Sequence, residues 1–250
     1  ADGRTITTGG FPRTATGPDL TQLFVGSEGT LGVITGARLA LRPVPPAERR
    51  AAYAAPSFAA GLDLCRRALR RGATPAVLRL YDEVESKRNY ATADGQNVVM
   101  VLDEGDERIV DATMAIVDEE ATGPGGVGAE RLDEALVGQW LSHRNDVSAL
   151  ERYISGGLVV DTMEISGPWT ALPGIYDATC AAIGGVEGTL AVSAHCSHSY
   201  LDGGCLYFTF AGQPLTASDG TPDPQATDDY YRGVWDAGTR AVLAGGGSLS

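Results

Sequence analysis

The apolar and polar positions of this 250-residue chain alternate between two periods, which predict strands separated by helices. Residues 50–55 read as a short strand, and Ser57 then caps a helix that Gly72 ends. The apolar residues of that helix recur at spacings of four, three and four: Phe58, Leu62, Cys65 and Leu69. A second strand at residues 76–81 completes a β-α-β unit.

The same alternation continues towards the end of the sequence. Further strands are predicted at residues 97–102 and 158–165, and a hairpin is predicted at residues 189–197 and 205–211 around the turn-like sequence LDGG. Helices are predicted at residues 107–121, 131–141, 171–183 and 224–244. We find no internal repeat. The pattern predicts an α+β fold, with a largely antiparallel sheet covered by helices on one side.

The first part of the chain differs from the rest. Residues 1–22 have the composition of a loop, and residues 23–25 and 33–41 look like strands. The proline-rich sequence RPVPP at residues 42–46 predicts a stiff connecting segment in which strand pairing ends. We therefore expect a domain boundary there, with residues 1–46 and 47–250 in separate domains. Because the chain starts at Ala1 in what reads as the middle of a loop, we expect a fragment of a longer protein.

Charge and cysteine content narrow the class of protein. Acidic residues outnumber basic ones by 32 to 19, so a net charge of -13 argues against nucleic acid as a partner, although a local basic pocket for an anion remains compatible. Four cysteines without a C-x-x-C pair fit a reducing compartment, and we expect a cytoplasmic protein. No apolar run approaches the roughly 20 residues that span a bilayer.

A glycine-rich stretch lies beside the predicted strand at residues 33–41. Its spacing, G-x-x-G-x-x-G, fits neither the dinucleotide fingerprint nor the phosphate loop. The longer run GPDLTQLFVGSEGTLGVITGARLALRPVP resembles the FAD-binding domain of the vanillyl-alcohol oxidase type of flavoproteins. The resemblance implies FAD as cofactor, residues 1–46 as the tail of a PCMH-type FAD-binding domain, and a ferredoxin-like cap domain at residues 47–250. It also implies a lining of the cofactor site by Glu28, Gly29, Thr30, Leu31, Gly32, Val33 and Ile34.

Several downstream segments are similar to the alkyldihydroxyacetonephosphate synthase family of these flavoenzymes. They are PAVLRLYD, HRNDVSALERY, MEISGPW, SHSYLDGGCLYFTF and the closing AGGGSLS, which a histidine-rich motif follows in that family. The resemblance implies exchange of an acyl group for a fatty alcohol on a dihydroxyacetone phosphate through a flavin N5 adduct, in ether-lipid synthesis. A phosphate-bearing lipid or a hydroxyacid is the expected substrate, and peripheral membrane contact and a homodimer are compatible with it.

Two arginines are candidate site residues. Arg79 lies in an apolar strand pattern, where a charge is costly unless it is paired, faces a ligand or points to solvent at a sheet edge. The resemblance implies that Arg79 is catalytic. From the residues alone, Arg144 is a solvated arginine of a polar helix, whereas the resemblance implies that it binds the substrate phosphate, with Arg152 as a rival.

Tyr200 is the candidate for proton transfer. Strand alternation predicts one face for Cys196, His198 and Tyr200, where the tyrosine either packs on the sheet or, as the resemblance implies, exchanges a proton with substrate. The histidines at 195 and 198 are plausible metal ligands by type, but alternation puts them on opposite faces, so we predict no metal site. We expect structural roles for Glu164 and Trp169.

Two other functions remain open. FAD-linked D-2-hydroxyacid dehydrogenases of the glycolate or D-lactate kind carry G-H-x-G-D-G-N-x-H where this chain has AHCSHSYLDGGCLYF, so the second histidine and the Gly-Asn pair are missing. The third possibility is a non-catalytic remnant of the fold. The expected protein is an FAD-dependent enzyme, either a synthase-like transferase or an oxidoreductase.

Overall fold

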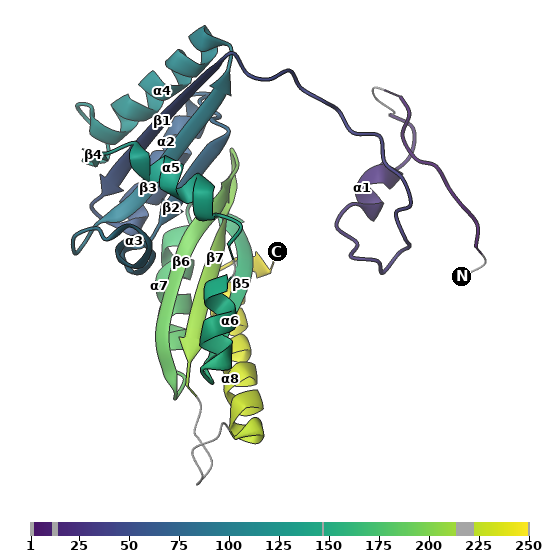
Figure 1. The fold of residues 1–250 in the computed structure, drawn as a ribbon, viewed down its shortest axis with the longest axis vertical. Helices are drawn as coiled ribbons and strands as arrows, with labels where there is room; N and C mark the ends of the chain where they lie inside the picture. Colours follow the sequence, from purple (N-terminus) through teal and green to yellow (C-terminus); the bar gives the residue numbers. More distant parts are fainter. Residues whose placement is uncertain (1–2, 12–14, 147, 214–222, 250) are drawn as a thin grey trace. The chain divides into compact units, whose positions relative to one another are not determined.

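The computed structural model describes residues 3–11, 15–146, 148–213 and 223–249. The chain divides into two compact units, Ala1–Val44 and Pro45–Ser250. The larger unit is built on one antiparallel sheet of eight strands in the order β4-β1-β3-β2-β6-β7-β5-β8 (Figure 1). Its strands are β1 (Ala47–Ala55), β2 (Val77–Tyr81), β3 (Asn97–Gly105), β4 (Glu130–Leu132), β5 (Val159–Pro168), β6 (Thr189–Ser199), β7 (Gly203–Gly212) and β8 (Ser248–Leu249).

The helices of this unit alternate with the strands along the chain. They are α2 (Phe58–Arg70), α3 (Glu83–Tyr90), α4 (Glu107–Thr122), α5 (Ala135–His143), α6 (Ser148–Ser155), α7 (Leu172–Gly184) and α8 (Pro224–Ala244). Elements β1-α2-β2-β3-α4-β4 form one β-α-β-β-α-β motif with strand order 4-1-3-2, which is the ferredoxin-like arrangement. Elements β5-α7-β6-β7-α8-β8 form a second motif with the same order read from the other end of the sheet. The unit therefore contains a structural repeat, joined through β2 and β6.

The repeat was missed in the sequence because it lies in the order of elements rather than in side-chain identity. Both motifs contribute their second strand to the junction, where Leu80 pairs with Cys196 and Tyr81 pairs with His195. The predicted α+β fold with an antiparallel sheet and a ferredoxin-like arrangement is confirmed. The junction brings residues more than 100 positions apart in sequence into direct register.

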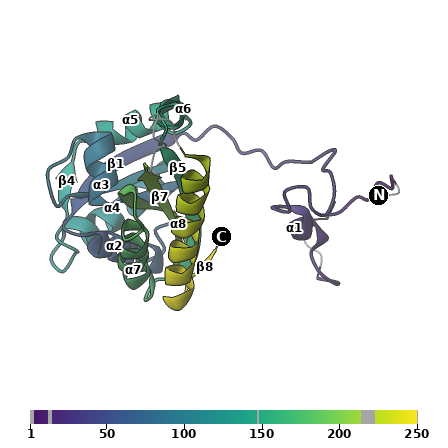
Figure 2. The ribbon, with the colours of Figure 1, turned by 90° about the horizontal axis from the view of Figure 1, so that it is seen from below.

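Helices lie on both faces of the sheet, so the predicted one-sided cover is wrong. Figure 2 shows α2, α7 and α8 on one side of the sheet and α5 and α6 on the other. The reason is that β3 is apolar on both faces, since Val98, Val99, Met100, Val101 and Leu102 follow one another and are all buried. The main hydrophobic core lies under α2 and α7, and a second core lies under α5, around Tyr81, Met100, Val137 and Trp140.

Most predicted elements are confirmed within a few residues. The Ser57 hydroxyl accepts a hydrogen bond from the Ala60 amide at 3.1 Å and caps α2, and α8 has the predicted bounds. The predicted helix at residues 131–141 is wrong at its start, because residues 130–132 pair with β1 as strand β4. The short helices α3 and α6 were not predicted, and α3 has little apolar periodicity to reveal it.

The smaller unit contains one short helix among its described residues, α1 (Leu20–Phe24), which Asp19 caps. The predicted strands at residues 23–25 and 33–41 are wrong. Leu23 lies in α1, and residues 33–41 form no strand because the described residues of this unit provide no partner strand. The apolar side chains of this segment are consequently exposed, among them Val33, Leu39 and Leu41.

None of the helices in the described ranges is both long and apolar enough to cross a membrane.

Candidate functional site

A row of side chains crosses the face of the sheet that carries α5 and α6. Tyr81 on β2 pairs with His195 on β6, which pairs with Tyr207 on β7, which pairs with Glu164 on β5. Residues paired across antiparallel strands point to the same face, so these four side chains form one continuous row, which we call the polar row. The row begins at the junction of the two ferredoxin-like motifs.

Arg79 lies on the same face, two residues before Tyr81 on β2. Its guanidinium carbon lies 5.7 Å from the ring centroid of Tyr81 and 5.4 Å from that of Trp140. Its Nε is buried without a hydrogen bond, and among the described residues no acidic side chain forms an ion pair with it. A partly buried charge with an unsatisfied donor is costly in free energy unless a ligand supplies the missing partner.

Arg144 contacts the same tryptophan as Arg79. It is the C-cap of α5 rather than an interior helix residue, as the sequence had suggested. Its guanidinium carbon lies 5.5 Å from the ring centroid of Trp140, so one buried indole contacts both arginines. Trp140 was not recognised as a site residue, although its position four residues before Arg144 on a helix was a readable signal.

His195 is a largely enclosed ionisable group of the polar row. Its ring lies between the rings of Tyr81 and Tyr207, with centroid distances of 5.3 Å and 5.2 Å. Its Nδ1 lies 2.9 Å from Oε2 of Glu85, and the Glu85 carboxylate also accepts hydrogen bonds from the hydroxyls of Ser193 and Thr209.

The Glu85 carboxylate is buried and is stabilised by these contacts. Burial raises its pKa, but the hydrogen bond and charge of His195, followed by the charge of Arg88, outweigh burial and lower the pKa below its ordinary value. Sequence reasoning did not single out Glu85, because α3 was not predicted. Without that helix, nothing indicated that this glutamate points back onto the sheet.

A bulge in β6 changes which side chains share a face. Cys196 pairs with Leu206, whereas His198 pairs with Cys205, so Ser197 is an extra residue on this strand. The predicted common face for Cys196 and His198 is therefore wrong. Cys196 joins the main core, while His198 is turned to the opposite side.

The same bulge overturns the prediction that His195 and His198 point to opposite faces. Both lie on the face of the polar row, and Nδ1 of His198 is 3.7 Å from Oε1 of Glu164. Glu164, expected to be structural, is thus half-exposed beside a histidine. Among the residues that the structure describes, no group of three or more His, Cys, Asp or Glu side chains has a geometry that could hold a metal ion.

Tyr200 follows the end of β6 in the hairpin turn. Its amide donates to the carbonyl of Gly203 at 2.8 Å, and its carbonyl accepts a hydrogen bond from Nε1 of Trp169 at 3.0 Å. The residue is 54% exposed, and within the described part of the chain its hydroxyl makes no hydrogen bond. The turn fixes the main chain of Tyr200 and leaves the phenol open to a partner.

The predicted cofactor segment lies in the smaller unit. All seven of its residues are exposed, and Glu28 has a left-handed backbone with φ 48° beside Gly29 at φ 82°. In the described part of this unit, the amides of residues 31–34 make no hydrogen bond, and Leu31, Val33 and Ile34 expose apolar side chains. Free amides next to exposed apolar side chains fit a flavin, whose ring is flat and apolar with polar edges.

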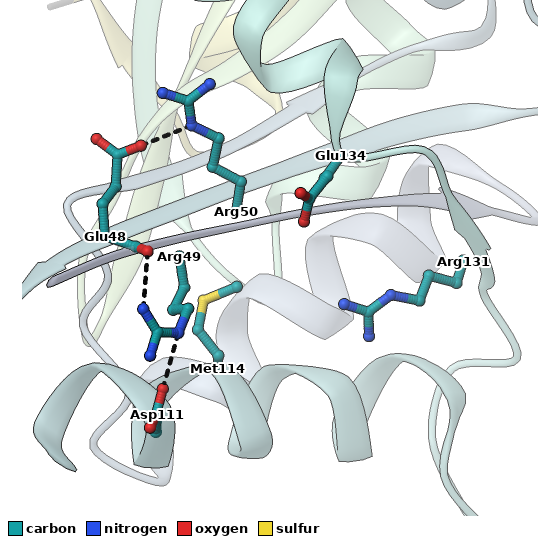
Figure 3. Close-up of a pocket in the computed structure, with 7 residues that line it drawn as sticks. All are labelled: Glu48, Arg49, Arg50, Asp111, Met114, Arg131 and Glu134. Carbon is teal, nitrogen blue, oxygen red and sulfur yellow. Dashed lines mark hydrogen bonds and ion pairs between the residues drawn. The ribbon is translucent and has the colours of Figure 1, made fainter. Parts of the chain in front are cut away.

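A surface hollow of about 460 Å³ lies elsewhere, between β1, α4 and the start of α5 (Figure 3). Its arginines are already paired: Arg49 with Glu107 and Asp111, and Arg50 with Glu48. Arg131 pairs with Asp118. The hollow contains none of the predicted site residues, and its internal ion pairs leave little charge for a ligand.

Comparison with known proteins places the larger unit in a family. The model described as "FAD linked oxidases, C-terminal domain" matches residues 44–250. The uncharacterized FAD-linked oxidoreductase YgcU of Escherichia coli O157:H7 is 29% identical over 222 residues, which are 84% of this chain and 45% of that protein. Alkyldihydroxyacetonephosphate synthase of Trypanosoma brucei brucei is 26% identical over 231 residues, covering 81% of this chain and 38% of that protein.

A solved structure has a similar fold. An alkyldihydroxyacetonephosphate synthase structure superimposes with a TM-score of 0.75 over 94% of this chain and 46% of that chain, at 22% identity. At that identity the likeness shows the fold alone. The chain spans about half the length or less of the relatives that it matches.

Proposed function

The chain belongs to the FAD-linked oxidase C-terminal domain family, and on this premise we propose that it supplies the substrate-binding side of an FAD-dependent enzyme. When bound, FAD supplies a ring that reacts with carbon or takes up electrons. The exposed segment from Glu28 to Ile34 would line that cofactor. The polar row and the two arginines would face the substrate.

The observation that carries the substrate assignment is the pair of arginines around Trp140. Their guanidinium carbons lie 5.4 Å and 5.5 Å from the same ring centroid. Among the described residues neither arginine forms an ion pair. Two unpaired guanidinium groups held by one rigid ring suit a doubly charged oxyanion such as a phosphate ester.

We therefore propose exchange of an acyl group for a fatty alcohol on a dihydroxyacetone phosphate. Arg79 and Arg144 would hold the phosphate, and Tyr200, open on the hairpin turn, would contact the reacting end of the substrate. The similarity to alkyldihydroxyacetonephosphate synthase of Trypanosoma brucei brucei supports this assignment. The free energy that the unsatisfied Nε of Arg79 costs argues against a non-catalytic remnant.

The second candidate is oxidation of a D-2-hydroxyacid. The same arginine pair would bind a carboxylate, and the similarity to an FAD-linked oxidoreductase of Escherichia coli O157:H7 supports net redox chemistry. The two candidates differ in one respect that an assay can measure, because only oxidation delivers electrons to an acceptor.

The test uses the full-length protein loaded with FAD under anaerobic conditions. It receives either acyl-dihydroxyacetone phosphate with hexadecanol, or glycolate or D-lactate with an artificial electron acceptor. The proposal predicts an ether product and free fatty acid in equal amounts, with no reduced acceptor. Bleaching of the flavin by a hydroxyacid with stoichiometric acceptor reduction, and no ether product, would establish the second candidate instead.

A further inference from the structure

The hairpin turn that carries Tyr200 is held by a residue from another part of the chain. Trp169 directly follows the end of β5, where Pro168 pairs with Gly203 of β7. It donates both of its N–H groups to the turn: its amide to the carbonyl of Asp202 at 3.4 Å, and its Nε1 to the carbonyl of Tyr200 at 3.0 Å. One tryptophan therefore holds the main chain of the turn at two points.

The indole that makes the second of these bonds is itself fixed. Trp169 is only 7% exposed and belongs to the main hydrophobic core, together with Leu172 and Ile175 of α7. Side chains in a close-packed core keep one orientation, and a buried indole N–H needs a hydrogen-bond partner. The partner here is the main chain of Tyr200, the residue that the proposed function places at the reacting end of the substrate.

The glycines after the turn allow this close approach. A Cβ at Gly203 would clash with the carbonyl oxygen of Gly167 on β5. A Cβ at Gly204 would lie 3.4 Å from Cη2 of Trp169 and 3.1 Å from the carbonyl oxygen of His198. Neither position has room for a side chain, so the end of β5, the indole and the start of β7 are packed directly against one another.

The position of the Tyr200 phenol depends on its main chain. The amide donates to the carbonyl of Gly203 at 2.8 Å, and the carbonyl accepts from Trp169, so both main-chain groups are bonded. Two side-chain torsions then remain to place the ring. Within the described residues the hydroxyl makes no hydrogen bond that would hold it. A shift of the turn would therefore move the phenol with it.

We propose that Trp169 is the positioning residue of Tyr200. The inference rests on the proposed function, in which Tyr200 contacts the reacting end of the substrate. Trp169 acts through the main chain of the turn and needs no contact with substrate or flavin. Because a misplacement of about 1 Å can cost on the order of 100-fold in rate, loss of one hydrogen bond at this point should be measurable in kcat.

The test compares Trp169→Phe with a matched control in the full-length, FAD-loaded protein. Phenylalanine keeps an aromatic ring in the core and removes the N–H. The control is Trp235→Phe on α8, because Nε1 of Trp235 also makes one hydrogen bond, to Oδ2 of Asp161 at 3.2 Å, and its ring also packs against the main core. The rate of ether formation is measured with acyl-dihydroxyacetone phosphate and hexadecanol.

We expect Trp169→Phe to lower kcat at least about 10-fold and to change KM less than about threefold, because the arginines proposed to bind the phosphate are left intact. Trp235→Phe should change kcat less than about threefold. Retention of more than a third of the wild-type kcat by Trp169→Phe would overturn the proposal.

A double-mutant cycle gives a readout that a merely structural role would not produce. If Trp169 acts through the phenol, its N–H has nothing left to position once the hydroxyl is gone. The double variant Trp169→Phe, Tyr200→Phe should then have the kcat of Tyr200→Phe alone, within about twofold. A further loss of about 10-fold in the double variant would show independent effects and would contradict the proposal.

A second substitution keeps the proposal testable if Trp169→Phe fails to fold. Benzothienylalanine, introduced at position 169 by nonsense suppression, keeps the bicyclic ring and has sulfur in place of the N–H. The same loss of kcat is expected, and a wild-type kcat would overturn the proposal.

The outcomes separate this inference from the proposed function. Full activity of Trp169→Phe together with an impaired Tyr200→Phe removes only the role of Trp169. Full activity of Tyr200→Phe removes the role of Tyr200 and this inference with it, and leaves the assignment of the arginines intact. Absence of ether product from the wild type removes the proposed exchange reaction as well.

Discussion

Replacement of Arg79 by methionine should abolish activity without lowering the stability of the fold. Methionine keeps most of the apolar length of the side chain and removes the guanidinium. In the substrate-free protein that guanidinium has a buried Nε without a hydrogen bond, and within the described residues no acidic partner. If Arg79 serves ligand binding at a cost to stability, its replacement should lower activity and leave the stability of the fold unchanged or higher.

The size of the effect follows from two opposing contributions. The unsatisfied buried Nε costs on the order of 1–3 kcal/mol, and Arg79→Met removes that cost. The contacts with the Tyr81 and Trp140 rings, at 5.7 Å and 5.4 Å, are worth about 0.5–1 kcal/mol each, and Arg79→Met loses them. The two contributions nearly cancel, so the free energy of unfolding should stay within about 1–2 kcal/mol of the wild-type value and Tm should change by only a few degrees, about 2–4 °C per kcal/mol.

The assay is thermal unfolding of the full-length protein without substrate, followed by far-UV circular dichroism and by flavin fluorescence. Arg67→Met serves as the matched control, because Arg67 pairs with Glu120 at 2.5 Å and donates to the carbonyl of Gly125 at 2.8 Å. The control should lower the free energy of unfolding by about 1–2 kcal/mol. A fall in Tm of more than about 5 °C for Arg79→Met, or unchanged kcat/KM, would refute the reasoning.

Two further predictions concern the packing around β2. Gly61→Ala should destabilise the protein by about 1–2 kcal/mol in chemical denaturation, because a Cβ there would lie 2.8 Å from Cδ2 of fully buried Leu80; equal stability would show that Leu80 moves aside. Burial raises the pKa of Asp82 to about 6, so the native state binds its proton more strongly than the unfolded state. The free energy of unfolding should therefore fall by on the order of 3 kcal/mol between pH 4 and 7 relative to Asp82→Asn, and a pH-independent difference would contradict this.

Much of the fold could be predicted from the sequence because its helices and strands have strong local sequence signals. The four-three-four spacing from Phe58 to Leu69, the cap at Ser57 and the hairpin around β6 and β7 each act within a few residues. The segment at residues 33–41 carried an equally strong apolar pattern and yet forms no strand. A strand depends on a partner to pair with, and no local pattern states whether one is present.

The candidate site could be predicted only in part from the sequence, because its geometry depends on contacts between residues that are distant in sequence. Arg79 and Arg144 could be named one by one, but nothing in the sequence showed that both contact Trp140. The bulge at Ser197 reverses the faces of the residues that follow it, and alternation alone cannot reveal such an insertion.

The most direct test of the account is the affinity of the arginine pair for a phosphate ester. Isothermal titration of the full-length protein with dihydroxyacetone phosphate is compared for the wild type, Arg79→Met, Arg144→Met and the control Arg49→Met, whose guanidinium is already paired with Glu107 and Asp111. We expect Kd to rise at least about 10-fold for Arg79→Met and for Arg144→Met, and to stay unchanged for Arg49→Met. Equal Kd values for the wild type and all three variants would contradict the assignment of this face of the sheet to the substrate.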